Sequence, residues 1–267
     1  VNGYATATPV SDGQHVWAIF GNGIGCCYDL QGNRLWARFI QKPRNAWGHS
    51  ASPVLADGKL IMHVTTMQAL DPLTGELLWE ANVPMYWGTP VVAEVAGTPV
   101  IITPNGYAVR ATDGAILAQK IGNCTYAAPV LYQGVLYFAD DQQDWRAVRL
   151  PTTLEPFTVQ ELWHARPRKD RYYSSPVVHD GIIYGITRAH ILSALDAATG
   201  ELVYEQNLTM GQGECYSSLT LAGDRIIAIC DNGTMVVFAA GRTYQEIARN
   251  TLDTCRACPV FVGDRMY

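Results

Sequence analysis

The sequence predicts an all-β fold built from repeated four-stranded antiparallel sheets, the blades of a β-propeller, and three observations support this. One phrase at residues 69–79 returns at 194–204 with seven of eleven residues identical, and in shorter form at 27–36. A second phrase, a small residue followed by proline and apolar residues, recurs about every 42 residues, the length of a four-stranded blade. No segment sustains an apolar period of 3.6 residues over three turns, so we expect helices to be incidental at most.

The composition is that of a packed domain without a nucleic-acid partner. The 267 residues are 48% hydrophobic and 16% charged, and the formal net charge is −5. Nucleic-acid binding requires a basic face, and the one basic cluster, at residues 166–169, is short enough to be a solvated loop. No apolar stretch reaches the ~18–20 residues of a membrane helix. We therefore expect no nucleic-acid partner and no transmembrane segment.

The proline phrases divide the chain into six complete blades and part of another. They lie at residues 8–10, 52–54, 89–91, 128–130, 175–177 and 258–260, with a degenerate copy at 218–220. The blades predicted from them span residues 4–43, 48–84, 86–122, 125–169, 172–210 and 215–253, with a partial blade at 255–267. We expect one propeller domain over residues 1–267. We interpret the chain as a piece of a longer protein, with seven or eight blades in the intact ring.

Four short strands are expected in each unit, and the fifth unit shows them most clearly. Residues 175–179 and 182–186 are separated by the turn residues Asp180 and Gly181, and residues 191–196 and 201–205 by a turn that ends in Gly200. These runs are rich in β-branched and aromatic residues, which favour strands. In the second turn, glycine supplies a positive φ, and the Asp and Thr side chains can bind the turn's own amides.

An aromatic residue follows the second turn on the outermost strand of most units. Trp36, Trp79 and Tyr204 stand four residues after a turn glycine, and Trp163 ends the longer and irregular fourth unit. A large flat side chain at this place can dock against the next blade, where its burial contributes roughly 2–3 kcal/mol. The third unit departs from the pattern because it has Ala118 there.

The repeat Ala-x-Asp-x-x-Thr-Gly-x-x-x-Trp resembles the tryptophan-docking repeats of pyrroloquinoline-quinone (PQQ)-type β-propellers. That family includes quinoprotein alcohol dehydrogenases, an outer-membrane-assembly lipoprotein and many secreted bacterial proteins. Residues 4–10 and 20–23 resemble bacterial PQQ-binding-like repeat proteins in particular. The resemblance covers essentially the whole chain. It implies a periplasmic or extracellular bacterial protein.

A candidate binding face lies at the entry to the innermost strands, which line the central channel of a propeller. Aromatic residues recur three and four residues before the proline of each phrase (Leu219 in the degenerate copy), which we call the anchor, and a histidine and an arginine join them. The candidates are His49, Tyr86, Trp87, Tyr126, Tyr172, Tyr173, Tyr216 and Arg256. One interpretation is packing between blades. The other is a channel mouth that binds a protein partner or a small, flat or saccharide-like ligand.

Cysteines also gather before the proline phrases. Cys215 and Cys255 hold the same place in consecutive units, Cys124 lies five residues before Pro129, and Cys258 directly precedes Pro259. In an exported protein, a Cys215–Cys255 or a Cys255–Cys258 disulfide is possible, and free thiols in a packed rim are the alternative.

The adjacent pair Cys26 and Cys27 permits a comparison with quinoprotein alcohol dehydrogenases, which carry a disulfide between neighbouring cysteines. Successive side chains of a regular strand point to opposite faces, so we expect these two cysteines, like Cys230, to be core residues.

The sequence favours an exported, non-catalytic propeller that acts as a binding or assembly scaffold through the channel-mouth face. It contains no nucleophile elbow, phosphate loop or paired-histidine metal motif. The alternative is a PQQ-dependent dehydrogenase of alcohols or sugars, which would need the quinone and calcium. Dehydrogenases of the family carry a calcium-binding Glu/Asn/Asp set that matches no positions here. No catalytic, cofactor-binding or metal-binding residue is therefore assigned.

Overall fold

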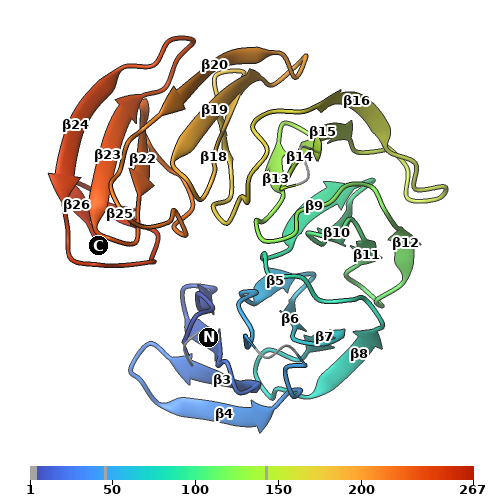
Figure 1. The fold of residues 1–267 in the computed structure, drawn as a ribbon. Coiled ribbons are helices and arrows are strands. Elements are labelled where there is room, and N and C mark those ends of the chain that lie inside the picture. The colour runs from blue at the N-terminus through green and yellow to red at the C-terminus, as the bar shows by residue number, and fades with distance from the viewer. Residues whose placement is uncertain (1–4, 45–46, 142–143) are drawn as a thin grey trace. The chain divides into compact units, whose positions relative to one another are not determined.

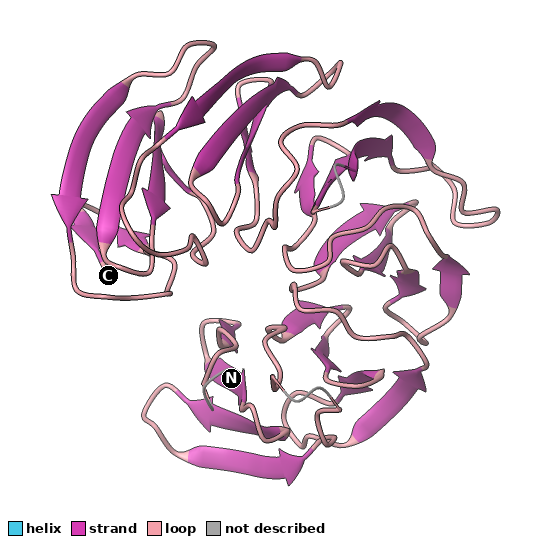
Figure 2. Cartoon of the chain, in the orientation of Figure 1, coloured by secondary structure: helices cyan, strands magenta, loops and turns pink. Residues whose placement is uncertain are grey.

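The computed structural model describes residues 5–44, 47–141 and 144–267, and all regular structure in this part is β-strand. Its 26 strands form six four-stranded antiparallel sheets and one two-stranded sheet (Figures 1 and 2). The predicted fold class, an all-β protein made of propeller blades, is confirmed. Among the described residues, none belongs to a helix that is long and apolar enough to cross a membrane. Tyr4, where the first predicted blade begins, lies outside the described residues.

The chain divides into two compact units, and that it forms one propeller domain stays a prediction. Unit 1 comprises Val1–Asn123 and Leu150–Val159, and unit 2 comprises Cys124–Arg149 and Gln160–Tyr267. The strands of each sheet follow one another in chain order, and each pairs with the next in antiparallel register. This up-and-down order follows from the short turns, which can only connect antiparallel neighbours.

Unit 1 holds three sheets. The first contains β1 (Val10–Ser11), β2 (His15–Ile19), β3 (Ile24–Asp29) and β4 (Arg34–Phe39). The second contains β5 (Val54–Ala56), β6 (Lys59–His63), β7 (Met67–Leu70) and β8 (Leu77–Ala81). The third contains β9 (Val91–Val95), β10 (Thr98–Ile102), β11 (Ala108–Arg110) and β12 (Ile116–Ala118).

Unit 2 holds the remaining sheets. The fourth contains β13 (Val130–Tyr132), β14 (Val135–Asp140), β15 (Asp144–Arg149) and β16 (Gln160–Ala165). The fifth contains β17 (Val177–His179), β18 (Ile182–Ile186), β19 (Ile191–Asp196) and β20 (Leu202–Asn207). The sixth contains β21 (Thr220–Ala222), β22 (Arg225–Ile229), β23 (Thr234–Ala239) and β24 (Glu246–Thr251). The last has only β25 (Phe261–Val262) and β26 (Arg265–Met266).

The fourth predicted blade, 125–169, is interrupted. Residues 150–159, which connect β15 to β16, belong to unit 1, whereas both strands belong to unit 2. Within unit 1, Arg110 Nη1 lies 3.3 Å from Glu155 Oε1, and Phe157 is buried. The fourth blade is therefore longer and less regular because it contains this segment, which packs within unit 1 before the chain returns to the fourth sheet.

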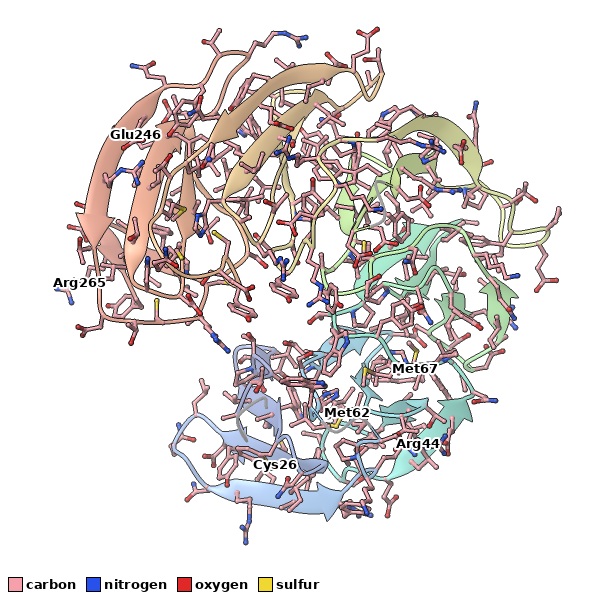
Figure 3. The ribbon with its side chains drawn as sticks, in the orientation of Figure 1. Cys26, Arg44, Met62, Met67, Glu246 and Arg265 are labelled. Carbon is pink, nitrogen blue, oxygen red and sulfur yellow. The ribbon has the colours of Figure 1, made fainter. Side chains whose placement is uncertain are left out.

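The hydrophobic core of each unit lies between successive sheets. Strands β14 and β18 are buried at every residue, whereas the fourth strands β4 and β24 are largely exposed. Met62 and Met67 lie among the strands of the second sheet (Figure 3), and both are fully buried. They pack against the first and the third sheet respectively, because neighbouring strands direct side chains to both faces.

Three docking tryptophans share one contact with the following sheet. Each indole Nε1 donates a hydrogen bond to a carbonyl just before or within the turn after the third strand. The pairs are Trp36 to Pro72 (2.8 Å), Trp79 to Ala111 (3.0 Å) and Trp163 to Ala197 (2.9 Å). Each ring also lies directly on the turn glycine, so a Cβ there would come within 2.8 Å, 2.6 Å and 2.7 Å of the ring at Gly75, Gly114 and Gly200. The glycine is thus needed for its missing side chain as well as its positive φ.

Tyr204 makes a different contact from the tryptophans. Its ring lies 6.3 Å from that of Tyr244 in an edge-on arrangement. Its hydroxyl has no hydrogen-bond partner among the described residues, and burial raises its pKa. The indoles of the docking tryptophans donate hydrogen bonds to turn carbonyls, whereas the Tyr204 ring contributes apolar packing against Tyr244.

Candidate functional site

The predicted site residues lie in the segments that lead into the first strands, and their exposure to solvent divides them into two groups. Four residues before the anchor, His49, Tyr172 and Cys215 are at most 1% exposed. Three residues before it, Tyr173 and Tyr216 are half-buried, as are Trp87 and Tyr126, and Arg256 is exposed. Extended chain directs successive side chains to opposite sides. Only the second group therefore presents side chains to solvent, together with the half-buried Tyr86.

The first group belongs to the core. The Tyr172 hydroxyl donates to the Arg168 carbonyl at 2.8 Å, and its ring lies 5.3 Å from that of Trp145. Neither ring nitrogen of His49 makes a hydrogen bond among the described residues, and burial lowers its pKa. The neighbouring His63 donates from Nε2 to the Val83 carbonyl at 2.9 Å, and burial lowers its pKa to about 4. These side chains stabilise packing and cannot contact a ligand.

Tyr86, Trp87 and His49 lie in unit 1, whereas the other candidates lie in unit 2. The Trp87 carbonyl accepts a hydrogen bond from Ser50 Oγ at 2.8 Å, which joins the entry segments of the second and third sheets. The four half-buried or exposed candidates of unit 2 form a single cluster.

This cluster, which we call the aromatic row, consists of Tyr126, Tyr173, Tyr216 and Arg256. The ring centroids of Tyr126 and Tyr173 are 5.0 Å apart with planes at 77°, and those of Tyr173 and Tyr216 are 4.8 Å apart with planes at 2°. The Arg256 Cζ lies 4.1 Å from the Tyr216 centroid, in cation–π contact. Both faces of Tyr216 are therefore covered, so the row presents ring edges, hydroxyls and a guanidinium.

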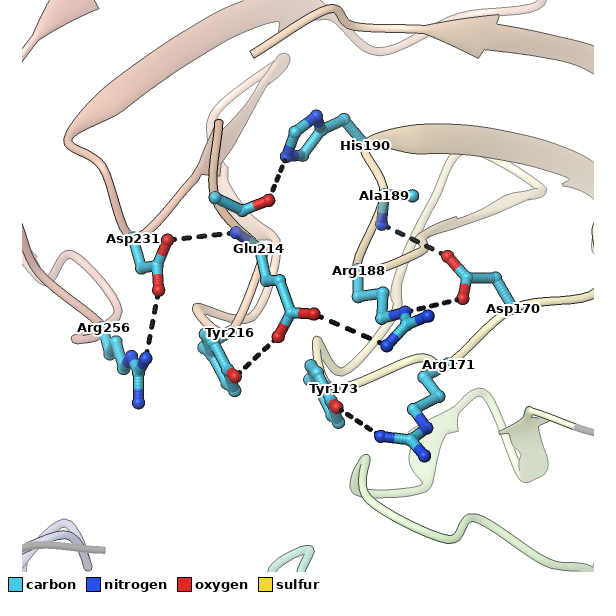
Figure 4. A network of polar contacts seen from close by, with 11 residues as sticks. Asp170, Arg171, Tyr173, Arg188, Ala189, His190, Glu214, Tyr216, Asp231 and Arg256 are labelled. Carbon is cyan, nitrogen blue, oxygen red and sulfur yellow. Dashed lines mark hydrogen bonds and ion pairs between the residues drawn. The ribbon is translucent and has the colours of Figure 1, made fainter. Parts of the chain in front are cut away.

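Carboxylates hold the row in place (Figure 4). The Tyr216 hydroxyl donates to Glu214 Oε2 at 2.6 Å, and partial burial together with this bond raises the pKa of Tyr216 to about 12. Arg256 Nη2 lies 3.1 Å from Asp231 Oδ2, and the other oxygen of Asp231 accepts from the Glu214 amide at 3.0 Å. Tyr216 and Arg256 are thus each bound to a carboxylate of the same sheet.

Two further arginines extend the network toward the fifth sheet. Arg188 bridges Asp170 at 3.0 Å and Glu214 at 3.5 Å. Arg171 Nη1 donates to the Tyr173 hydroxyl at 3.1 Å, and its Cζ lies 6.0 Å from the Tyr126 ring. The three arginines and three carboxylates of the network balance one another. The Arg256 side chain nevertheless remains 64% exposed at one end of the row.

A belt of hydrogen bonds joins the first residues of the proline phrases beside this site. In unit 2, the Ala128 amide donates to Ser175 Oγ at 3.0 Å, the Ser175 amide to Ser218 Oγ at 3.1 Å, and the Ser218 amide to Cys258 Sγ at 3.1 Å. Each first strand is thereby tied to the next one. Cys258 stands where every other copy except that of Ala128 has a hydroxyl residue.

Unit 1 contains the same belt. The Thr8 amide donates to Ser52 Oγ at 2.9 Å, and the Ser52 amide to Thr89 Oγ1 at 3.0 Å. These bonds were not predicted from the sequence. The sequence does contain a signal for them, because the first residue of the phrase is Ser, Thr or Cys in every copy except that of Ala128.

All seven cysteines lie in the described residues and are free, so neither disulfide suggested by the sequence forms in this structure. Cys215 packs in the cluster between the fifth and sixth sheets, whereas Cys255 packs on the other side of the sixth sheet with Ile227 and Ile229. Equivalent places in consecutive units are therefore separated by a whole sheet. Cys258 is exposed and belongs to the belt.

Cys26 and Cys27 occupy neighbouring places on β3, and both are buried and free. The Cys26 thiol contacts the Ala18 carbonyl at 3.7 Å, and Cys27 belongs to the core between the first and second sheets. Both are core residues, as the strand pattern predicted. Among the residues that the structure describes, no three His, Cys, Asp or Glu side chains gather closely enough to hold a metal ion.

The sheets, docking tryptophans and entry segments define a PQQ-like β-propeller protein. A family model described as outer membrane protein assembly factor BamB matches residues 1–152 and 152–244, so the chain belongs to this family. The resemblance stated from the repeat is confirmed.

Solved structures show the same fold. BamB from Moraxella catarrhalis is 14% identical with a TM-score of 0.77, over 98% of this chain and 81% of that one. The computationally designed Ika8 protein is 14% identical with a TM-score of 0.74, over 100% of this chain and 80% of that one. Hsv2 from Kluyveromyces lactis is 10% identical with a TM-score of 0.55, over 85% and 70%. The search of curated proteins found no match.

Proposed function

We propose that this chain is a non-catalytic propeller of the bacterial periplasm that binds a protein partner during the assembly of outer-membrane proteins. The description of its family, an outer membrane protein assembly factor, supports both the role and the location. The aromatic row is the proposed contact with the partner.

The composition and rigidity of the row are the observations that carry this proposal. Tyrosine and arginine are the residues that most often dominate the energy of protein interfaces. The Tyr173 and Tyr216 rings are already stacked, and Arg256 is held by Asp231, so little side-chain freedom remains to be lost on binding. A rigid half-exposed row of this kind suits the centre of an interface.

The chemistry of the row favours a peptide over a sugar. Saccharides stack on free aromatic faces, and both faces of Tyr216 are covered by its neighbours. The Arg256 side chain is exposed, and the Tyr173 hydroxyl, which accepts a hydrogen bond from Arg171, keeps its own proton to donate; both groups recognise carboxylates and backbone carbonyls. We therefore infer a partner segment that presents acidic side chains or main-chain carbonyls.

A binding measurement with a matched pair of variants tests the proposal. The purified chain is titrated against the outer-membrane protein assembly complex of the same bacterium, and the dissociation constant is measured by biolayer interferometry. Arg256→Glu should weaken binding about tenfold or more, because it reverses the charge at the end of the row.

The matched control is Arg225→Glu. Arg225 is 61% exposed and pairs with Asp224 on the same sheet, away from the row. It should leave the dissociation constant within about twofold of the wild type. Equal effects of the two variants, or no binding by the wild-type chain, would contradict the proposal.

A further inference from the structure

Two buried thiols lie side by side next to the aromatic row. Cys215 immediately precedes Tyr216, and Cys230 immediately precedes Asp231, the carboxylate that holds Arg256. Both cysteines are fully buried in the cluster between the fifth and sixth sheets. An added Cβ at Gly213, two residues before Cys215, would lie 2.8 Å from Cys230 Sγ, so the Cys230 thiol lies against the entry segment that carries Cys215. The sequence repeat gave no reason to pair them, because they hold different places in one unit.

The backbone around the two cysteines keeps them adjacent. The Asp231 amide donates to the Glu214 carbonyl at 3.0 Å, and the Glu214 amide donates to Asp231 Oδ1 at 3.0 Å. These bonds join the entry segment to the β22–β23 loop one residue away from each cysteine. A disulfide requires Cα atoms roughly 4.4–6.8 Å apart, which is the range found for residues on directly hydrogen-bonded backbones.

We propose that Cys215 and Cys230 form a disulfide when the chain folds in an oxidising compartment. The proposal rests on the periplasmic location in the proposed function, since disulfides persist there and not in the cytosol. The bond would tie the segment that carries Tyr216 to the loop that carries Asp231. It would thereby fix the spacing between the last two members of the aromatic row.

The oxidant is a disulfide of the glutathione or oxidoreductase class. One cysteine thiolate attacks it to give a mixed disulfide and releases the first thiol. The second cysteine thiolate attacks the protein sulfur of that mixed disulfide and releases the second thiol. The two cysteines lose two protons and two electrons, and the oxidant gains them.

The thiol–disulfide exchange takes place during folding and not in the folded protein. Burial raises the pKa of both thiols, which keeps them protonated and unreactive once the core has closed. The bond must therefore form while the sixth sheet is still assembling against the fifth.

A metal site is the competing use of these sulfurs. Met210 Sδ lies 3.9 Å from Cys215 Sγ, and His190 Nε2 lies 3.5 Å from Cys230 Sγ. The His190 nitrogen, however, also bonds the Gly213 carbonyl at 3.1 Å. No three His, Cys, Asp or Glu side chains of the described residues converge as ligands. The arrangement favours a bond between the two sulfurs.

Oxidative refolding tests the pairing directly. The full chain is reduced and unfolded in urea, then refolded in a buffer of reduced and oxidised glutathione. Free thiols are alkylated, and the peptides are mapped by mass spectrometry. We expect one linked peptide pair, Cys215 with Cys230, and alkylation of the other five cysteines. The melting temperature should exceed that of the reduced protein by about 6 °C or more, because the bond removes chain entropy from the unfolded state.

Three variants provide the controls. Cys215→Ser and Cys230→Ser should each abolish the linked peptide and the rise in melting temperature. Cys124→Ser should keep both, since Cys124 is equally buried and lies in the segment that leads into β13. Natively folded protein with seven free thiols after oxidative refolding, or a link from Cys215 to Cys255, would overturn the proposal. The mapping needs no partner, so its failure and a failure of the binding experiment are separate results.

Discussion

Two buried histidines of unit 1, His49 and His63, make the stability of the protein depend on pH. His63 is 2% exposed, and its folded-state pKa of about 4 lies below its ordinary value of 6.5 because burial disfavours the charged ring. Burial lowers the pKa of His49 in the same direction. Between pH 6.5 and 4 the unfolded chain therefore binds protons that the folded chain does not. Stability is fully present above pH 6.5 and falls as the pH drops through this window.

His63→Gln tests this pH dependence. Glutamine can keep a donor for the Val83 carbonyl but carries no titrating group. For the wild type, the unfolding free energy should fall by up to about 3 kcal/mol from His63 between pH 7 and 4, as the shift in pKa implies. The variant should lose correspondingly less. Urea unfolding at pH 8, 7, 5 and 4 measures both, and an identical pH dependence in the two proteins would contradict the assignment.

At the scale of residues, the sequence predicted only part of the candidate site. The recurrence of aromatics before the anchors identified the right segments, and Tyr126, Tyr173, Tyr216 and Arg256 do gather in the structure. The sequence could not show that the rings cover one another, because stacking depends on the distance between neighbouring first strands. Nor could it place Glu214 and Asp231, whose roles arise from packing between an entry segment and a loop.

In three pairs of successive sheets, the organising element is the contact between a tryptophan and the next turn. The sequence predicted the aromatic residue and the turn glycine as separate features. Only the structure shows that Trp163 lies on Gly200 and donates to the Ala197 carbonyl. A repeat reports what recurs within a unit. It does not report which features of consecutive units contact each other.

Gly200→Ala and Gly181→Ala separate the two roles of glycine. Both residues have φ of 73° and belong to the fifth sheet. An added Cβ at Gly200 would lie 2.7 Å from the Trp163 ring, whereas nothing lies within 4 Å of one at Gly181.

Both variants should lose about 1 kcal/mol of stability to left-handed strain. Gly200→Ala should lose roughly 1–3 kcal/mol more, because the tryptophan must move. Denaturant unfolding measures the difference. Equal losses would show that the docking contact does not contribute to stability.

At the scale of the whole molecule, the repeat determined most of what could be predicted. Every sheet lies within one of the predicted blade ranges, because each range contains the turns that define its own strands. The segment at residues 150–159 was not anticipated to leave its sheet and pack in unit 1. Its interactions, such as that of Glu155 with Arg110, occur in one blade only, so a repeat in the sequence cannot predict them.

The scaffold role also predicts a negative result for the whole chain. Purified protein incubated with PQQ and calcium should show no dye-linked oxidation of alcohols or sugars above that of heat-denatured protein. The reason is that no position of the chain matches the calcium-binding set of the family's dehydrogenases. Turnover that depends on both the quinone and calcium would favour the dehydrogenase alternative and overturn the scaffold proposal.

The belt of anchor bonds has a consequence for how such a chain can change in length. Each copy supplies one amide to its successor and offers one side-chain acceptor to its predecessor, as Ser52 and Ser175 do. Duplication of a single unit in the gene would therefore add a matched donor and acceptor at the same time. Growth or loss of blades would leave no link unpaired, except beside Ala128, whose methyl group offers no acceptor.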